Sequence, residues 1–351
     1  MGDSWPVVRA AAVQAAPVFL DRDASTEKAC ALIAEAGAAG AELVVFPEGF
    51  IPAHPSWFHF HIGSSPVATD FGARLFTNAV EVPGPQTDRI ARAAAEAGVY
   101  VVMGVCERLP GTFGSMYNTQ VFFGPEGTVL GKHQKLAATA TERLVHRGGH
   151  GDTLSVMHTS FGPLSGLICG ENSNPLAIFT MAAQHTMVHA MSWPSHFSMW
   201  GPPMRQRTLG DSIAFARMTK AYVVSSCSVV DDATVSALML TEEQEETLRG
   251  AECGGSVVVG PEGKLRGDQL GDVEGILYAD LDLSVGVREK LQHDFVGHYN
   301  RDDVFELRLN TGVPHLFSSS SASLAAAPVD PLDPGAPQTS GAPGPAGEVT
   351  G

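Results

Sequence analysis

Basic residues are scarce in this chain of 351 residues. It has 22 lysines and arginines against 38 aspartates and glutamates, a formal net charge of −16. No stretch gathers several Lys or Arg residues together. Nucleic-acid binding depends on cationic side chains that neutralise phosphates. We therefore expect no nucleic-acid partner, and we interpret the acidic surface as a source of solubility.

Long apolar runs are also missing. No run approaches the roughly 18–20 residues that a membrane-spanning helix needs, so we expect no membrane partner. Residues 1–6 contain neither the basic segment nor the apolar core of a secretion signal. The hydrophobic share, 44%, is enough for one large globular domain.

Cysteines are few, odd in number and widely spaced, and no two form a CxxC pair. The five are Cys30, Cys106, Cys169, Cys227 and Cys253. Disulfide frameworks and zinc knuckles need paired cysteines, so this pattern argues against both. It favours a reducing compartment, and we expect a cytoplasmic protein.

Large apolar residues become rare at the end of the chain. From residue 318 to residue 351 Ser, Ala, Pro and Gly dominate, and such a composition cannot build a core. We predict one domain over residues 1–317 and a disordered tail over residues 318–351.

What the first 317 residues do contain is an alternation of apolar strands and helical patterns. Strands are predicted at 7–14, 43–46, 99–107, 162–168, 186–191 and 221–227, and helices at 24–39, 88–97, 176–183 and 205–219. Hairpins with Gly-Pro-Glu-Gly turns are predicted at 117–132 and 255–267. Continuously apolar strands between helices indicate an α/β fold in which helices cover the sheet.

Residues 51–82 differ from this pattern. They are rich in aromatic residues, proline and histidine, with little periodicity, and we predict a long loop that forms the wall of a site. His54, His59 and His61 are candidate metal ligands. No acidic or thiolate partner follows at ligand spacing, so we expect no metal.

The apolar run 162–168 ends on Cys169, followed by Gly170, Glu171 and Asn172. A cysteine at such a strand-to-helix turn has its sulfur close to backbone N–H groups, which favour a thiolate nucleophile. The alternative is a buried structural cysteine, which is common in cytosolic proteins.

Two other predicted strands also end on a reactive residue. Phe46-Pro47-Glu48 ends one strand, and Lys135 ends another. With Cys169, in this order, they resemble the three signatures of the carbon–nitrogen hydrolase superfamily, over about residues 7–305.

The segments 135–143 and 148–152 are similar, more narrowly, to the nitrilase branch. This resemblance implies a four-layer α-β-β-α sandwich, no cofactor, and a homo-oligomer that is a dimer or a stacked spiral. Nitrilases usually carry an aromatic residue directly after the nucleophile. Here that position is Gly170, so we expect a wider or reshaped pocket wall.

The chemistry of carbon–nitrogen hydrolysis suits these residues. Cys169 attacks the carbon, and Glu48 takes the thiol proton. The charge that develops on nitrogen or oxygen is stabilised by Lys135 and by the Gly170 amide. The resemblance gives Glu142 the part of a second carboxylate, which holds the lysine in place and charged. Two neighbouring carboxylates also tend to differ in pKa.

The remaining assignments are less specific. The resemblance places His54, Trp57, Gly170, Ser192 and Trp193 at the substrate pocket. Two residues keep an alternative. Glu142 either holds Lys135 or pairs with Arg143 or solvent alone. Glu171 either lies in the site or caps the next helix.

The expected function is that of a nitrilase, which converts a small-molecule nitrile and two waters into a carboxylic acid and ammonia. An amide hydrolase or a cyanide-hydrolysing enzyme of the same superfamily is the nearest alternative. A non-catalytic assembly protein would be expected to lose Glu48, Lys135 or Cys169, and a redox sensor lacks a resolving cysteine close by in the sequence.

Overall fold

Two mixed β-sheets form the centre of the structure, a computed structural model that describes residues 4–196 and 201–314. The six-stranded sheet has the order β11 (Gly275–Asp282), β1 (Val7–Gln14), β2 (Leu43–Val45), β3 (Tyr100–Arg108), β4 (Met116–Phe123), β5 (Val129–Gln134). The five-stranded sheet has the order β10 (Val257–Val259), β9 (Tyr222–Cys227), β8 (Val188–Trp193), β7 (Gly162–Ile168), β6 (Met157–Thr159). In each sheet the middle strands, β1–β3 and β7–β9, are parallel. The predicted tail, residues 318–351, lies outside the described residues.

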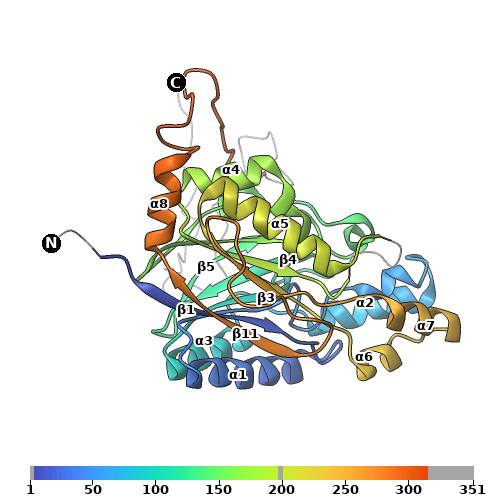
Figure 1. Ribbon diagram of the computed structural model, residues 1–351. Helices are drawn as coiled ribbons and strands as arrows, with labels where there is room; N and C mark the ends of the chain where they lie inside the picture. The colour runs from blue at the N-terminus through green and yellow to red at the C-terminus, as the bar shows by residue number, and fades with distance from the viewer. Residues whose placement is uncertain (1–3, 197–200, 315–351) are drawn as a thin grey trace, which may run out of the picture. The chain divides into compact units, whose positions relative to one another are not determined.

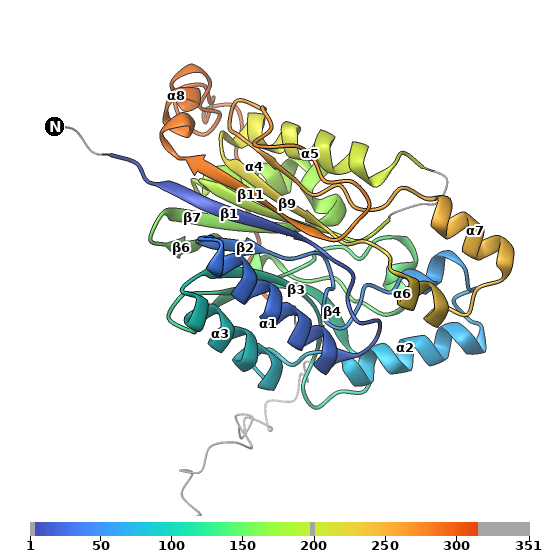
Figure 2. The ribbon, with the colours of Figure 1, turned by 60° about the horizontal axis from the view of Figure 1, so that its bottom comes forward.

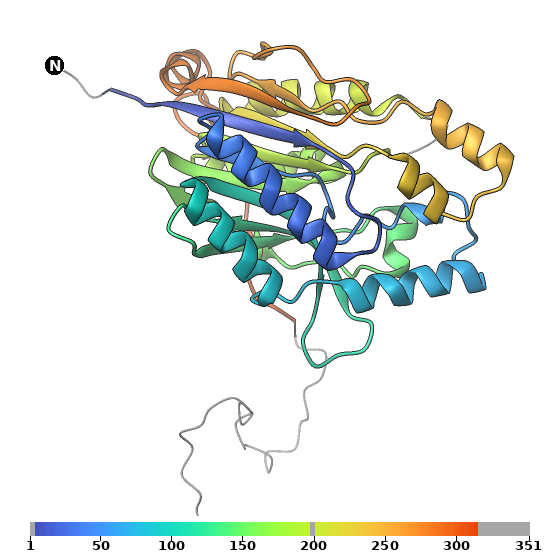
Figure 3. The same ribbon diagram turned by 90° about the horizontal axis from the view of Figure 1, so that it is seen from below.

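Helices cover the outer face of each sheet. α1 (Arg22–Ala38) and α3 (Pro85–Ala97) pack on the six-stranded sheet, and α4 (Pro175–Ala183) and α5 (Met204–Thr219) pack on the five-stranded one (Figure 1). Figures 2 and 3 show these two helical layers on opposite sides of the strands. The inner faces meet in an apolar core that includes Val102 and Phe122 from one sheet and Leu164 and Val224 from the other. The predicted four-layer α-β-β-α sandwich is therefore confirmed.

Local sequence signals account for the ends of several helices. The Asp21 carboxylate accepts the Ala24 N–H at 2.9 Å before α1, and the Asn174 side chain accepts the Leu176 N–H at 3.0 Å before α4. Gly98 ends α3 with φ +66°, a left-handed conformation that favours glycine. The helix that follows Cys169 is thereby capped by Asn174.

The prediction of a loop over residues 51–82 was partly wrong. This segment contains a short 3₁₀ turn (Ser56–His59) and α2 (Pro66–Asn78), whose first turn is capped by Ser65. Only three α2 side chains are buried, Ala68, Phe71 and Leu75. Their helical spacing is correct, but the Gly, Thr and Asp residues between them hide it from a reading of the sequence.

The second predicted hairpin is also reduced. β10 turns at 260–263, but the returning chain pairs through one bridge only, between Val259 and Leu265. Leu265 is exposed, so no apolar burial drives the pairing further.

The remaining helices are α6 (Asp232–Ala237), α7 (Glu242–Gly250) and α8 (Ser284–Gln292). α7 is an acidic helix, with four glutamates among residues 242–246 and only Leu248 buried. None of the described helices is long and apolar enough to cross a bilayer.

Candidate active site

Three strand ends meet at one cavity. Glu48 follows β2 by three residues, Lys135 directly follows β5, and Cys169 directly follows β7. All three side chains are buried, with residue exposures of 1%, 2% and 3%. The cavity has a volume of about 320 Å³, and Lys135, Glu142 and Cys169 contribute to its wall. The sequence thus placed these residues together correctly, although they belong to two different sheets.

Lys135 lies between two carboxylates. Its Nζ is 2.7 Å from Glu48 Oε1 and 2.8 Å from Glu142 Oε2. The Asn118 amide donates to both carboxylates, at 2.6 Å to Glu48 and 2.8 Å to Glu142. Glu142 also accepts the Thr139 N–H at 2.8 Å. Glu142 therefore contacts the lysine, and the alternative in which it pairs only with Arg143 or solvent does not hold.

The two carboxylates differ in acidity. Burial, with a contribution from the charge of Glu142, raises the pKa of Glu48 to about 7, against the opposing charge of Lys135. Burial also acts to raise the pKa of Glu142, but the His146 hydrogen bond and the Lys135 charge outweigh it and hold that pKa well below its usual range. Glu142 is therefore a permanent anion, and Glu48 exchanges its proton near neutral pH.

The lysine keeps its positive charge despite its burial. Burial alone lowers the pKa of Lys135, but the charges of Glu48 and Glu142 raise it well above its ordinary value. An ammonium group fixed between two carboxylates is suited to stabilising negative charge on a substrate atom.

Cys169 sits in a strained turn. Its φ is +53°, a conformation that side chains rarely adopt, and it begins a 3₁₀ turn (Cys169–Ser173). Burial and the charge of Glu48 raise the pKa of the thiol, although Lys135 and the Gly170 N–H act in the opposite direction. Burial therefore favours the protonated form of Cys169 over the thiolate. Because the resting group is a thiol, it needs a base.

Three of the predicted substrate-binding residues lie away from the cavity. Trp57 is fully buried behind Phe58, with ring centroids 5.3 Å apart, and Phe58 is the ring that reaches the cavity wall. The Ser192 hydroxyl donates to Phe46 O at 2.8 Å, and Trp193 O accepts the Glu48 N–H at 3.2 Å. Ser192 and Trp193 hold the segment that carries Glu48 and do not line the pocket.

The other two predicted residues lie at the site. His54 lines the cavity, with Nε2 3.8 Å from Glu48 Oε1. Gly170 is exposed next to the nucleophile, and a Cβ placed on it would meet no atom within 4 Å. Because Gly170 faces solvent and does not line the cavity, the expected wider pocket wall stays a prediction.

Several contributors to the site were not predicted. Asn118 and His146 surround the carboxylates, and His59 and His196 line the cavity with ring centroids 4.9 Å apart. Asn118 and His59 contact residues that lie far away in the sequence, and His146 lies in a segment without apolar periodicity. Asn118 lies on β4 beside two other polar residues, Thr119 and Gln120, so its amide gave no distinct signal.

Of the three histidines of residues 51–82, His54 and His59 line the cavity, whereas His61 lies apart from them. His61 Nε2 contacts Leu238 O at 2.7 Å, away from the cavity. Among the described residues one group has metal-ligand spacing, Glu48, His54 and Glu142, with ligand atoms within 4.8 Å of one another. The Lys135 ammonium pairs with both of these carboxylates, so their charge is already matched by a cation of the chain itself.

A buried cysteine beside a lysine and two carboxylates, at strand ends of an α-β-β-α sandwich, defines the class of amide- and nitrile-processing hydrolases that the signatures indicated. The carbon–nitrogen hydrolase family model matches residues 9–288. A nitrilase of Bacillus sp. (strain OxB-1) is 34% identical over 302 residues, covering 85% of this chain and 86% of that one. An aliphatic nitrilase of Sinorhizobium fredii is 37% identical over 305 residues, covering 85% and 94%. The chain belongs to the carbon–nitrogen hydrolase family, in its nitrilase branch.

Solved structures agree on the fold. Saccharomyces cerevisiae Nit3, a member of branch 10 of the nitrilase superfamily, matches with a TM-score of 0.65 at 20% identity, covering 85% of this chain and 97% of that one. A carbon-nitrogen hydrolase from Helicobacter pylori matches with a TM-score of 0.66 at 19% identity, covering 86% and 97%.

Proposed function

We propose that this protein is a nitrilase that converts an organic nitrile into its carboxylic acid and ammonia. The observation that carries the proposal is the position of the buried Lys135 ammonium between Glu48 and Glu142, on the wall of the cavity that Cys169 also lines. Relatives that share 34–37% of their residues over most of the chain are named nitrilases. The catalytic roles below are part of the proposal.

The first half of the reaction builds a covalent thioimidate. Glu48 accepts the Cys169 proton, and the sulfur attacks the nitrile carbon. One C–N π bond breaks, and the electron pair moves to nitrogen. Lys135 and the Gly170 N–H stabilise the developing charge, and Glu48 returns the proton to that nitrogen.

The second half consumes two waters. Glu48 deprotonates the first water, which adds to the thioimidate carbon and gives a tetrahedral intermediate. Glu48 returns that proton to the nitrogen and then transfers the hydroxyl proton to it as well, so that ammonia leaves as the C=O bond of a thioester on Cys169 forms. The second water, activated in the same way, releases the acid and restores the thiol. A pKa of about 7 lets Glu48 take and give protons alternately.

The walls of the cavity favour an uncharged substrate. Burial lowers the pKa of His54 to about 3, and it holds the pKa values of His59 and His196 below their ordinary value. These rings are therefore neutral and offer hydrogen bonds without a charge. A volume of about 320 Å³ suits a small nitrile. We also propose that the protein works as a homo-oligomer without a cofactor.

An amide hydrolase is the second candidate, because Nesterenkonia amidase has a similar fold, with a TM-score of 0.57. It would use the same residues and omit the thioimidate. The test is kcat/KM for matched nitrile–amide pairs from aliphatic, aryl and arylaliphatic series, with ammonia release as the readout. We expect nitriles to react far faster. A preference for the amide would contradict the nitrilase assignment and leave the family chemistry in place.

A further inference from the structure

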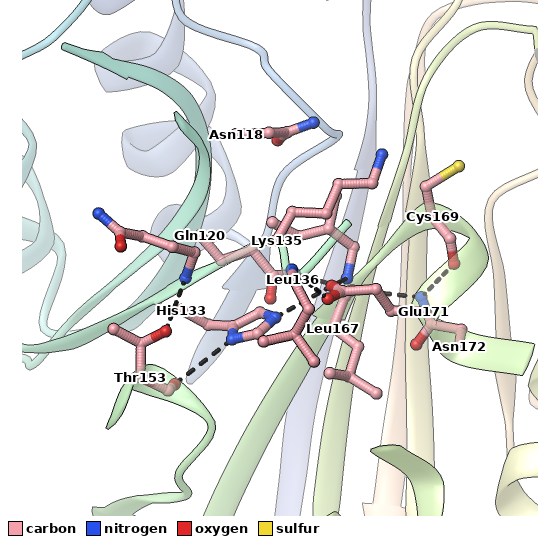
Figure 4. Close-up of polar contacts among 12 residues, drawn as sticks. Asn118, Gln120, His133, Lys135, Leu136, Thr153, Leu167, Cys169, Glu171 and Asn172 are labelled. Atoms are coloured by element: carbon pink, nitrogen blue, oxygen red, sulfur yellow. Dashed lines mark hydrogen bonds and ion pairs between the residues drawn. The ribbon is translucent and has the colours of Figure 1, made fainter. Parts of the chain in front are cut away.

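Glu171 is a further buried carboxylate, and it lies on the opposite side of Cys169 from the cavity (Figure 4). Glu171 Oε1 accepts the Leu136 N–H at 2.7 Å, and Oε2 accepts the Ile168 N–H at 3.0 Å. His133 Nε2 lies 3.0 Å from the same Oε2. Figure 4 shows the Cys169 sulfur and the Lys135 ammonium pointing to one side, with the Glu171 carboxylate and the His133 ring below them. Glu171 thus neither lines the cavity nor caps α4, the two alternatives that the sequence left open.

The backbone partners of Glu171 flank the two reactive residues. Leu136 directly follows Lys135, and Ile168 directly precedes Cys169. β5 and β7, which carry these residues, belong to different sheets. No strand ladder therefore fixes the lysine relative to the cysteine, and the Glu171 carboxylate joins the two strand ends directly.

The strained conformation of Cys169 gives an independent reason for such a support. A residue at φ +53° keeps that conformation only when its surroundings hold it. Glu171 holds the N–H of the preceding residue, and the Asn172 amide donates to Cys169 O at 2.9 Å. The strained residue is fixed on both sides.

We propose that Glu171 is a positioning residue, which sets the separation of the Lys135 ammonium and the Cys169 sulfur by anchoring both backbones. The inference rests on the proposed function for the reaction that it serves. Three donors converge on one carboxylate, so an acceptor-only group is required. A glutamine would direct an NH₂ group at a backbone N–H or at His133. Burial acts to raise the pKa of Glu171, but His133 and the two backbone N–H groups outweigh it, and the pKa is lowered.

The chain offers a matched control in Glu107. It is also buried, and it also binds residues of β5, Lys132 and Gln134. Every partner in its group is a side chain, including the Thr119 hydroxyl at 2.8 Å. Glu107→Gln therefore disturbs a buried carboxylate beside the same strand without releasing the backbone next to Lys135 or Cys169.

The experiment compares Glu171→Gln, Glu171→Asp and Glu107→Gln in the full-length chain. The readouts are kcat and KM for one nitrile, the rate of Cys169 alkylation by iodoacetamide across pH, and Tm. A misplacement of about 1 Å costs on the order of 100-fold in rate. For Glu171→Gln we expect kcat to fall about 10- to 100-fold with KM changed less than about threefold. We also expect the alkylation profile to move to higher pH, because Lys135 no longer stabilises the thiolate.

Glu171→Asp keeps the charge but not the reach, so we expect a smaller loss. Glu107→Gln should lower Tm without the kcat loss or the pH shift. A folded Glu171→Gln protein with wild-type kcat and alkylation profile overturns the proposal, and so does an equal kcat loss in Glu107→Gln. If Glu171→Gln does not fold, Glu171→Asp is judged by the same criteria. If the wild type hydrolyses no nitrile, the alkylation profiles still decide the positioning role.

Discussion

At the residue scale, the chemistry depends on two carboxylates, Glu142 and Glu48, that have different roles. Glu142 accepts hydrogen bonds from Asn118, Thr139 and His146 as well as the lysine, which fixes it as an anion. Glu48 has fewer donors, and its Oε2 has no partner among the described residues. An underbonded buried carboxylate has a high proton affinity. Lys135 thus serves as the counter-ion of Glu142 and also lies beside Glu48, which acts as the base.

Activity should depend on pH through Glu48. The base must be deprotonated, and its pKa is about 7, so kcat/KM should rise as pH increases and level off above pH 7. A pH profile of kcat/KM from about pH 5 to pH 9 measures this limb. A Glu48→Gln variant lacks the base and should retain no measurable turnover. A profile that is already flat at pH 5 would contradict the assignment of Glu48 as the titrating base.

Replacing the nucleophile should remove turnover and leave the fold intact. Cys169→Ala deletes one sulfur beside an existing cavity, so little new void is created and Tm should change by a few degrees at most. The wild-type protein, treated with a slowly hydrolysed nitrile, should show a covalent adduct on the Cys169 peptide by mass spectrometry. Cys227 is the internal control, because it is fully buried with its thiol donating to Pro194 O at 3.0 Å. An adduct on Cys227 would refute the assignment.

At the scale of elements, sequence patterns predicted what apolar burial determines. The strand Val7–Gln14 was predicted with its bounds because most of its residues are apolar and buried. α2 was missed because only three of its side chains enter the core. Glu48, Lys135 and Cys169 were found because each ends a buried strand. Asn118 and His146 were not assigned a role, and Glu171 kept two alternatives, because their roles come from partners that only the folded chain brings within reach.

A close contact between β3 and the segment that follows β2 holds Glu48 in its position. A Cβ on Gly104 of β3 would lie 2.0 Å from Pro47 O, so only glycine lets the Phe-Pro-Glu segment pack on that strand. Gly104→Ala should therefore displace Glu48, lowering stability by about 1–3 kcal/mol and kcat with it. Gly210→Ala is the matched control, because its Cβ meets nothing in α5 and should stabilise the helix by about 0.5–1 kcal/mol. Urea unfolding and kcat measure both effects. A Gly104→Ala protein with wild-type stability would contradict this close packing.

At the scale of the whole molecule, the site depends on the pairing of two sheets. The Gln120 amide donates to the Ser192 hydroxyl at 2.8 Å, and Ser192 donates to Phe46 O, so polar side chains link the sheets beside the catalytic residues. Glu171 adds a third link. Each sheet alone carries an incomplete set of reactive groups, and only the assembled sandwich places a thiol next to an ammonium and its base.

The last prediction concerns residues 318–351, which lie outside the described part of the chain. Their composition of Ser, Ala, Pro and Gly offers almost no apolar surface to bury. Deleting them should therefore leave Tm and turnover per subunit nearly unchanged, because the sandwich and the three strand ends are complete by residue 314. Differential scanning calorimetry, ammonia release and light scattering on the truncated protein provide the measurement. A drop of several degrees in Tm would mean that the tail packs on the domain, whereas a change in particle size alone would assign it to the contacts between subunits.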